Sequence, residues 1–179
     1  MKLVIFGLGS NKQFLNNSPL ENLVAACKEL QAILINPVFS SVYKTKAMYV
    51  EDQEDFYNMV ALGFVSDDLE PEDCLRFINK IEEKYGRNRD KEIRFGPRSL
   101  DIDIEEFGDV VIKTEKLQIP HIRIKERPFV LIPLLEIFPE YADEIKKNEY
   151  LESLLELENK GETEDVKLFI SREDFSKLL

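Results

Sequence analysis

The sequence predicts an α+β fold built as one domain, and three observations predict it. The chain has 179 residues, of which 44% are hydrophobic, and this suits one well-buried core but not two full domains. Short apolar runs indicate strands, and two longer segments with apolar residues every three or four positions indicate helices. Their order is strand, helix, strand, strand, helix, strand, which is the order of a split βαβ unit.

The first strand and the first helix are marked by local signals. Residues 2–8 form a short apolar run, which predicts a buried strand. A helix is predicted over residues 19–34, because its apolar positions form one stripe. Ser18 and Glu21 can form a capping box at its start, and Pro19 suits its first turn.

A strand pair and a second helix follow. Residues 38–44 and 56–65 are β-rich and close in sequence, so we expect them to pair antiparallel. The second helix is predicted over residues 71–85, and Gly86 should end it. A strand over residues 99–107 completes a ferredoxin-like fold, in which an antiparallel sheet has helices packed on one face and its other face open for ligands.

Extra C-terminal elements are predicted beyond this unit. Pro120, Pro128 and Pro133 should break the next stretch into loop and short helix. The last forty residues hold twelve acids and six bases, which is typical of a solvated helical flank. We therefore expect residues 1–179 to form a single domain, with an acidic extension over about 141–179 packed on it or appended to it.

Cysteine usage and hydropathy predict a cytoplasmic location. Cys27 and Cys74 fall on apolar helical faces without a paired spacing, which favours reduced core thiols over a disulfide or metal site. The apolar run at the start is too short for a signal peptide, and no stretch approaches the ~20 apolar residues of a membrane span.

Positive charge is concentrated in one segment of an acidic chain. The net charge of −11 argues against a general nucleic-acid binder, because affinity for a phosphate backbone depends on an excess of Lys and Arg. Five cations nevertheless fall within twelve residues, opposed only by Asp90 and Glu92; they are Arg87, Arg89, Lys91, Arg94 and Arg98. The composition of this segment therefore predicts a binding site for an anion.

Two aspartates share one face of the strand that follows, in the stretch FGPRSLDIDI. Side chains alternate along a strand, so Asp101 and Asp103 lie opposite the apolar face, and at roughly 6.5–7 Å between their Cα atoms they repel unless a cation is near. Such a pair alone is more often a solvated surface, but Arg98 lies directly beside this one. Carboxylates that hold Mg²⁺ next to arginines suit Mg-nucleotide chemistry.

Other candidate residues leave alternatives open. The chain has no P-loop motif, so basic side chains must hold any phosphates, and we interpret Gly7 to Asn11 as a tight turn rather than a dinucleotide fingerprint. His121, the only histidine, is either a structural residue or a phosphate contact. Phe56 and Phe129 either belong to the core or clasp a flat ring by stacking.

Taken together, several motifs make the chain resemble a known enzyme family; they are GLGSN, SSVYKT, DFYNMVAL, IEEKYGR, FGPRSLDIDI and IPHIRIKERPFVLIPLLEIFP. In this order and spacing they resemble the 6-hydroxymethyl-7,8-dihydropterin pyrophosphokinases of folate synthesis, over roughly residues 3–140. The resemblance implies a ferredoxin-like fold, two Mg²⁺ ions and ATP as co-substrate. It also implies transfer of the β,γ-pyrophosphate of ATP to the pterin hydroxymethyl oxygen with release of AMP, by an enzyme that is a monomer or weak dimer and binds no nucleic acid or membrane.

The resemblance also implies roles for matching positions. Asp101 and Asp103 would hold the metal ions, and Arg87 and Arg98 would act with them in catalysis. The positions expected to bind ATP are Asn79, Glu82, Arg89, Arg98, Ile104, Lys116, His121 and Arg127. The positions expected to bind the pterin are Thr45, Met48, Phe56, Asn58, Phe95 and Phe129.

Departures from the family pattern leave a second interpretation. Lys46-Ala47 stand where the family commonly has a proline pair, and Glu105-Glu106 replace an apolar pair, which suggests a more exposed strand end or a salt bridge to neighbouring bases. The alternative function is a catalytically silent relative that binds Mg-nucleotide or pterin. An RNA-binding sheet is disfavoured, because the chain is acidic and no strand carries the aromatic pattern that stacks bases.

Overall fold

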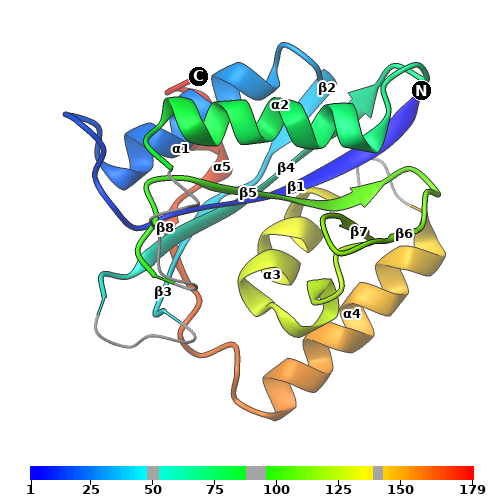
Figure 1. Ribbon diagram of the computed structural model, residues 1–179. Helices are drawn as coiled ribbons and strands as arrows, with labels where there is room; N and C mark the ends of the chain where they lie inside the picture. The colour runs from blue at the N-terminus through cyan, green and yellow to red at the C-terminus, as the bar shows by residue number, and fades with distance from the viewer. Residues whose placement is uncertain (48–52, 88–95, 139–142) are drawn as a thin grey trace.

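The computed structural model describes residues 1–47, 53–87, 96–138 and 143–179. One six-stranded sheet is formed by antiparallel pairings alone. Its strand order is β5 (Asp101–Phe107), β1 (Lys2–Ser10), β4 (Phe56–Val65), β3 (Val42–Thr45) and β8 (Lys167–Ile170), and β2 (Ile35–Phe39) also pairs with β4. Helices lie on both sides of this sheet (Figure 1). The expected residues Met48, Arg89 and Phe95 fall outside the described residues.

Three neighbouring strands of the sheet confirm the predicted pattern. They are β1 (Lys2–Ser10), β4 (Phe56–Val65) and β5 (Asp101–Phe107), and β1 lies between the other two. The segment from Gly7 to Ser10 continues β1, so our interpretation of it as a tight turn is wrong. Pairing with a strand on each side keeps this glycine-containing segment extended.

Two helices cover one face of the sheet. α1 (Pro19–Leu30) begins with the predicted capping box of Ser18 and Glu21 but ends four residues before the predicted end. A tight turn follows it, and Leu34 beyond this turn is still buried, which explains its place in the apolar stripe. α2 (Pro71–Lys84) agrees with its prediction, and Gly86 after it has a φ of 90°.

The predicted strand at 38–44 is divided in two. β2 (Ile35–Phe39) and β3 (Val42–Thr45) both pair with β4, and two buried serines lie between them. Ser40 makes this break possible: its backbone N–H donates to the Val60 carbonyl (2.9 Å), and its hydroxyl accepts from the Val60 N–H (2.9 Å). The backbone groups at the break are thus satisfied without a continuous strand.

The second face of the sheet is partly covered by later elements. The chain passes through β6 (Ile112–Lys113), β7 (Gln118–Ile119), the short 3₁₀ helix η1 (Ile124–Glu126), α3 (Pro128–Ile137) and α4 (Glu144–Asn159). α3 and α4 pack a second apolar cluster against Ile5, Val60 and Leu62. The prediction that Pro133 breaks this stretch is wrong, because α3 runs through it and packing of its buried face outweighs one lost hydrogen bond.

The C-terminal elements cross from the second face back to the first. β8 (Lys167–Ile170) adds a strand to the edge of β3, and α5 (Arg172–Ser176) then buries Phe175 in the core beside α1 and α2 (Figure 1). The fold class is the predicted one, an antiparallel α+β sheet with extra C-terminal elements.

Cys27 and Cys74 are buried free thiols, as predicted. In the described part of the chain, no helix is both long and apolar enough to span a membrane.

Candidate active site

Alternation along β1 and β5 separates the core from the candidate site. Ile102 and Ile104 of β5 face the core beneath α1 and α2. Asp101, Asp103 and Glu105 therefore face the opposite side of the sheet, and Asp101 and Asp103 lie beside Gly9 and Gly7 of β1. These two glycines have no side chains, which leaves room for the Glu105 side chain at Gly7 and for the Asn58 amide at Gly9.

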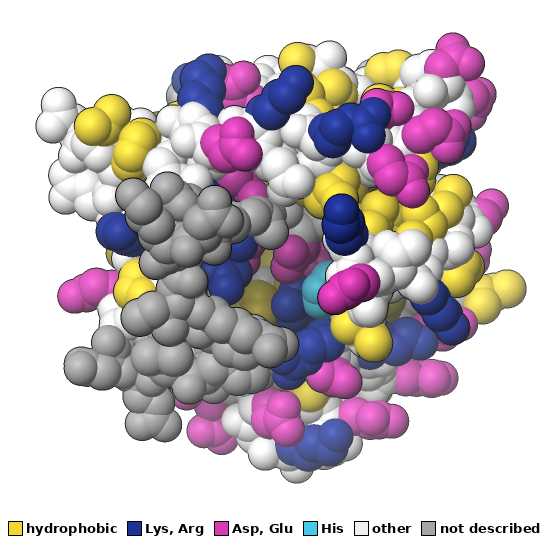
Figure 2. All heavy atoms as spheres, in the orientation of Figure 1, with side chains coloured by type: hydrophobic (Ala, Val, Ile, Leu, Met, Phe, Trp, Pro, Cys, Tyr) yellow, Lys and Arg dark blue, Asp and Glu magenta, His cyan; other side chains and the backbone are white. Residues whose placement is uncertain are grey.

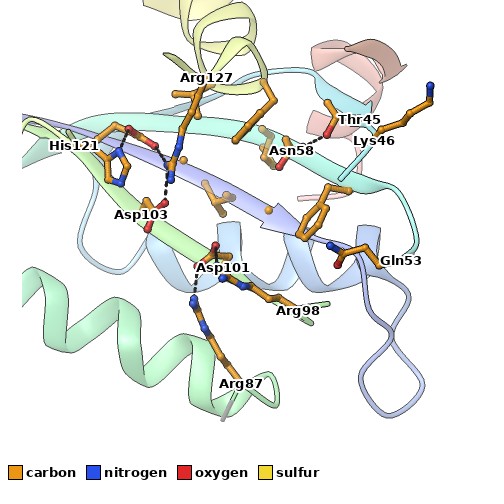
Figure 3. Close-up of a pocket in the computed structure, with 18 residues that line it drawn as sticks. Thr45, Lys46, Gln53, Asn58, Arg87, Arg98, Asp101, Asp103, His121 and Arg127 are labelled. Carbon is orange, nitrogen blue, oxygen red and sulfur yellow. Dashed lines mark hydrogen bonds and ion pairs between the residues drawn. The ribbon is translucent and has the colours of Figure 1, made fainter. Parts of the chain in front are cut away.

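A cavity of about 210 Å³ lies over this part of the sheet. On the face seen in Figure 2, the histidine and several basic side chains gather around a hollow. Ten of the residues expected from the sequence line the cavity: Thr45, Phe56, Asn58, Arg87, Arg98, Asp101, Asp103, His121, Arg127 and Phe129. Figure 3 shows the basic side chains approaching the two aspartates from opposite sides, Arg127 from one and Arg87 and Arg98 from the other.

Asp101 is held by two arginines. Arg87 and Arg98 each donate to one of its carboxylate oxygens. Burial alone would raise the pKa of Asp101, but the two guanidinium groups outweigh burial and hold this pKa below its usual value. Asp101 is therefore an ionised carboxylate that contacts two cations. A bound phosphate could accept hydrogen bonds from the same Arg87 and Arg98 side chains.

Glu82 supports this arrangement from beneath. It is 1% exposed, and its Oε1 accepts hydrogen bonds from Arg87 and from the Ile102 backbone N–H (2.8 Å). It thus ties the end of α2 to β5 and orients Arg87. Glu82 itself does not line the cavity, and its expected contact with ATP stays a prediction.

Asp103 and Glu105 lie on either side of Arg127. Arg127 Nη1 is 2.9 Å from Asp103 Oδ2 and 3.5 Å from Glu105 Oε1. Glu105 is completely buried, and burial together with the negative charge of Asp103 raises its pKa to about 8. Glu105-Glu106 therefore form no exposed strand end. The expected salt bridge is present at Glu106, to Lys146 (3.0 Å), whereas Glu105 lies near Arg127 without a hydrogen bond to it.

His121 faces the same carboxylates as a neutral ring. Burial, and then the positive charge of Arg127, lower the pKa of His121. Its Nδ1 accepts from the Arg123 backbone N–H (3.2 Å), so the neutral ring carries its hydrogen on Nε2. This leaves one N–H available as a hydrogen-bond donor.

The other end of the cavity has the features of a slot for a flat polar ring. Phe56 and Phe129 line it, and the Asn58 amide donates to the Thr45 hydroxyl (2.8 Å), which fixes the amide's orientation. A Cβ atom on Gly9 would lie 3.0 Å from Asn58 Oδ1, so the glycine makes room for this amide. At about 210 Å³ the cavity is smaller than the roughly 300–1,000 Å³ of typical ligand pockets, and it suits one small ring system.

Three other expected ATP positions also lie away from the cavity. The Ile104 side chain is buried in the core under the helices, because it alternates with the acids of β5. Asn79 is half-buried on α2, and Lys116 is exposed between β6 and β7. Neither of these two lines the cavity.

Sequence reasoning missed Gly7, Asn11 and Glu105. Alternation alone places Glu105 on the face of the two aspartates, so this signal was available. Asn11 accepts from the Arg98 N–H (2.7 Å) and donates to the Gln53 side chain (3.0 Å) and the Glu54 carbonyl (2.9 Å). These contacts join distant segments of the chain, which no local pattern predicts.

The carboxylates fit a hard cation bound together with phosphate. Among the described residues, no three His, Cys, Asp or Glu side chains cluster closely enough to hold a metal by themselves. Mg²⁺ needs fewer protein ligands than that, because one or two carboxylates commonly bind it together with substrate phosphates and water. Asp101 and Asp103 supply that donor set at the cavity.

The chain is similar to proteins of one known family. The family model described as 7,8-dihydro-6-hydroxymethylpterin-pyrophosphokinase matches residues 5–139. Proteins named 2-amino-4-hydroxy-6-hydroxymethyldihydropteridine pyrophosphokinase are 37% identical in Aquifex aeolicus, over 78% of this chain and 82% of that protein, and 39% identical in Haemophilus influenzae, over 73% and 78%.

Larger proteins contain a similar region. The folic acid synthesis protein FOL1 of Dictyostelium discoideum is 37% identical over 78% of this chain, which corresponds to only 20% of that protein. The crystal structure of Plasmodium falciparum HPPK-DHPS with SDX-DHP matches with a TM-score of 0.62 at 17% identity, over 94% of this chain and 47% of that one. At this identity the structural match supports the fold alone.

Proposed function

The chain belongs to the 7,8-dihydro-6-hydroxymethylpterin-pyrophosphokinase family, the ATP-dependent pyrophosphokinases of folate biosynthesis, and we propose that the cavity over Gly7 and Gly9 is its active site. In the reaction, the hydroxymethyl oxygen of 6-hydroxymethyl-7,8-dihydropterin forms a bond to the β-phosphorus of ATP. The bond from that phosphorus to the oxygen bridging to the α-phosphorus breaks. The hydroxyl proton is released, and AMP leaves.

One observation carries the proposal: two ionisable carboxylates of β5 meet three arginines in one cavity. Asp101 contacts Arg87 and Arg98, and Asp103 contacts Arg127. Opposite charges arranged in this way can exchange partners, because a triphosphate is an acceptor for arginines and a metal ion is a partner for carboxylates. Phosphoryl transfer depends mainly on such positioning and charge stabilisation.

We propose that Asp101 and Asp103 hold two Mg²⁺ ions between them. Held by these two carboxylates, the metal ions would supply positive charge against the charge that develops on the transferred phosphates. Arg87, Arg98 and Arg127 would then turn from carboxylates to phosphate oxygens, and His121 would donate its Nε2 hydrogen to the same anion.

We propose that the pterin occupies the slot next to the carboxylates. Phe56 and Phe129 line this slot and offer ring faces for stacking, while the fixed amide of Asn58 offers hydrogen bonds to the polar edge of the pterin. The hydroxymethyl group would point toward Asp101 and Asp103, where the β-phosphorus is held. Enclosure of the ring in this small cavity would limit the access of water to the transfer.

For the whole chain we propose a single catalytic domain with an extension from about residue 141. Pairing of β8 with β3, and burial of Phe175 in the core, support an extension that is packed on the domain. We propose a monomer or weak dimer that acts on small molecules in the cytoplasm. The buried free thiols of Cys27 and Cys74 are consistent with a reducing compartment.

An AMP-release assay with ATP, the hydroxymethyl dihydropterin and Mg²⁺ tests the proposal. Asp103→Asn and Arg98→Ala should each lower kcat/KM by about 100-fold or more, because each removes a charge that acts on the transferred group. Asp109→Asn is the matched control, since Asp109 is an exposed acid just beyond β5 and outside the cavity. Wild-type activity in both site variants would refute the assignment of the site.

A binding experiment tests the slot separately. Phe129→Ala should weaken binding of the pterin by about tenfold, because a stacked ring face contributes roughly 0.5–1.5 kcal/mol beyond the area that it buries. Binding of α,β-methylene ATP should change little. Equal losses for both ligands would contradict a pterin-specific role for Phe129.

A further inference from the structure

Glu105 is a buried carboxylate that the proposed reaction leaves without a role. It is the third acid on the cavity face of β5, after Asp101 and Asp103, and its side chain is 0% exposed. Neither of its carboxylate oxygens has a hydrogen-bond partner among the described residues. An unpaired polar group in such a place costs free energy, so its presence calls for an explanation.

The surroundings of Glu105 hold its carboxylate at this point. A Cβ atom on Gly7 would lie 2.7 Å from Glu105 Oε1, so only a glycine at this position of β1 leaves room for the carboxylate. The Glu105 carbonyl accepts from the His121 backbone N–H (2.9 Å), which fixes the strand against the segment after β7. The carboxylate is thus enclosed between β1 and the segment that carries His121 and Arg127.

Arg127 is the neighbouring residue to which Glu105 can offer a hydrogen-bond acceptor. Its Nη1 is hydrogen-bonded to Asp103 Oδ2 at 2.9 Å and stands 3.5 Å from Glu105 Oε1, beyond a good hydrogen bond by a few tenths of an ångström. The His121 ring is no competitor, since its Nδ1 is 3.8 Å from Glu105 and already accepts from Arg123. The Arg127 guanidinium therefore lies between two acids and bonds to only one of them.

This arrangement matters if Asp103 must release Arg127. On the proposed function, Asp103 binds a metal ion, and its oxygens are then less available to the arginine. The Arg127 side chain is 16% exposed, so losing its partner would leave a largely buried cation unpaired. A second acceptor within a short movement avoids that cost.

We propose that Glu105 is a positioning residue that accepts Arg127 when Asp103 turns to a metal ion, so that Arg127 stays aimed at the phosphates. The inference rests on the proposed function of Asp103. It does not depend on the charge of Glu105, because a neutral carboxyl group also presents an acceptor oxygen to Arg127.

Other charged groups nearby cannot take this role in the observed arrangement. Glu106 is also buried, but it is occupied by Lys146 Nζ at 3.0 Å and by the Tyr150 hydroxyl. Asp101 is occupied by Arg87 and Arg98. Glu105 is thus the acid of β5 with an unused acceptor beside Arg127.

The test measures metal binding directly. Mn²⁺ is titrated into the full chain in the presence of α,β-methylene ATP, and the electron paramagnetic resonance signal of free Mn²⁺ reports binding without turnover. Glu105→Leu, which keeps a similar volume but no acceptor, should raise the half-saturating Mn²⁺ concentration by about tenfold, since Arg127 then competes for Asp103. Glu105→Gln keeps an acceptor oxygen and should stay within about threefold of wild type.

Control variants separate this role from a structural one. Glu106→Gln changes the neighbouring buried acid and should leave the half-saturating Mn²⁺ concentration unchanged, whatever it does to stability. Should Glu105→Leu fail to fold, Gly7→Ala serves in its place, because the added methyl group displaces Glu105 Oε1 from Arg127 while the carboxylate remains.

The outcomes distinguish the two proposals. If Asp103→Asn weakens Mn²⁺ binding but Glu105→Leu and Gly7→Ala do not, the role of Glu105 is refuted and the metal assignment stands. If Asp103→Asn also leaves Mn²⁺ binding unchanged, the proposed function of Asp103 fails. Equal weakening by Glu105→Leu, Glu105→Gln and Glu106→Gln would show a general loss of structure and would likewise overturn the positioning role.

Discussion

Replacing Glu105 by glutamine should stabilise the folded chain at alkaline pH and leave its stability nearly unchanged near pH 4. Burial and the charge of Asp103 raise the pKa of Glu105 from 4.5 to about 8 in the folded state. Below pH 4.5 the carboxyl group is protonated in both the folded and unfolded states. As the pH rises from there, the unfolded chain releases a proton that the folded chain keeps, so the free energy of unfolding falls until the pH passes about 8. Glutamine is neutral throughout and removes this dependence.

The size of the effect follows from the same interval. Each pH unit between 4.5 and about 8 contributes about 1.4 kcal/mol, so the contribution of Glu105 falls by up to about 5 kcal/mol. Relaxation around the carboxylate reduces this value, and a difference of several kcal/mol between the variant and wild type is expected at pH 9. The other titrating groups are common to both proteins and largely cancel in the comparison.

Urea denaturation followed by circular dichroism at pH 4, 6, 8 and 9, without metal or nucleotide, measures this difference. Glu106→Gln is the matched control, because it alters an adjacent buried acid that already has two partners. The stability of Glu105→Gln relative to wild type should rise steadily with pH. A difference that stays constant from pH 4 to pH 9 would refute the raised pKa and the account of the buried carboxylate.

Three further predictions concern the arginines, the pterin slot and the C-terminal helix. Arg87→Ala should lower the free energy of unfolding by about 3 kcal/mol, because it removes a buried cation that contacts both Glu82 and Asp101. Arg98→Ala should cost less, since that side chain is 19% exposed, and urea denaturation of both variants checks the order. Gly9→Ala should push the Asn58 amide by a few tenths of an ångström and weaken pterin binding about tenfold, with α,β-methylene ATP binding unchanged in calorimetry. Tyr150→Phe should lower stability by roughly 1–3 kcal/mol by removing a donor from a buried carboxylate, without changing kcat; an unchanged melting temperature would contradict this.

The face of the sheet that carries the two aspartates could be predicted because it depends on a local rule. Alternation along a strand places Asp101 and Asp103 together whatever the rest of the fold does, and both line the cavity. The expectation of an exposed end at Glu105-Glu106 failed for a non-local reason. The pairing of β5 with β1 shifts register between Ile5 and Phe6, and both glutamates are buried at this irregularity.

Partners from distant parts of the chain were beyond the reach of sequence patterns. Glu106 is covered by Lys146 and Tyr150 of α4, about forty residues further along the chain. Composition indicated only that this C-terminal segment is acidic and helical. The short apolar run at residues 166–170 marks the place of the strand Lys167–Ile170, but it does not identify the partner, which is the edge of β3.

The prediction of a turn at Gly7 was wrong because glycine occurs in two different structural settings. Glycine commonly marks a turn, but it also marks a strand that another group approaches closely. Here Glu105 approaches Gly7 and Asn58 approaches Gly9, and both glycines stay within β1. Only the positions of the approaching side chains distinguish the two cases.

A crystal structure with α,β-methylene ATP, the hydroxymethyl dihydropterin and Mn²⁺ in place of Mg²⁺ tests the central claim most directly. Anomalous scattering locates the metal ions without reference to the protein chemistry assumed for them. We predict two peaks within coordination distance of the Asp101 and Asp103 carboxylates, with Arg87, Arg98 and Arg127 turned to the phosphates. Metal ions bound elsewhere, with both aspartates still paired to their arginines, would contradict the claim.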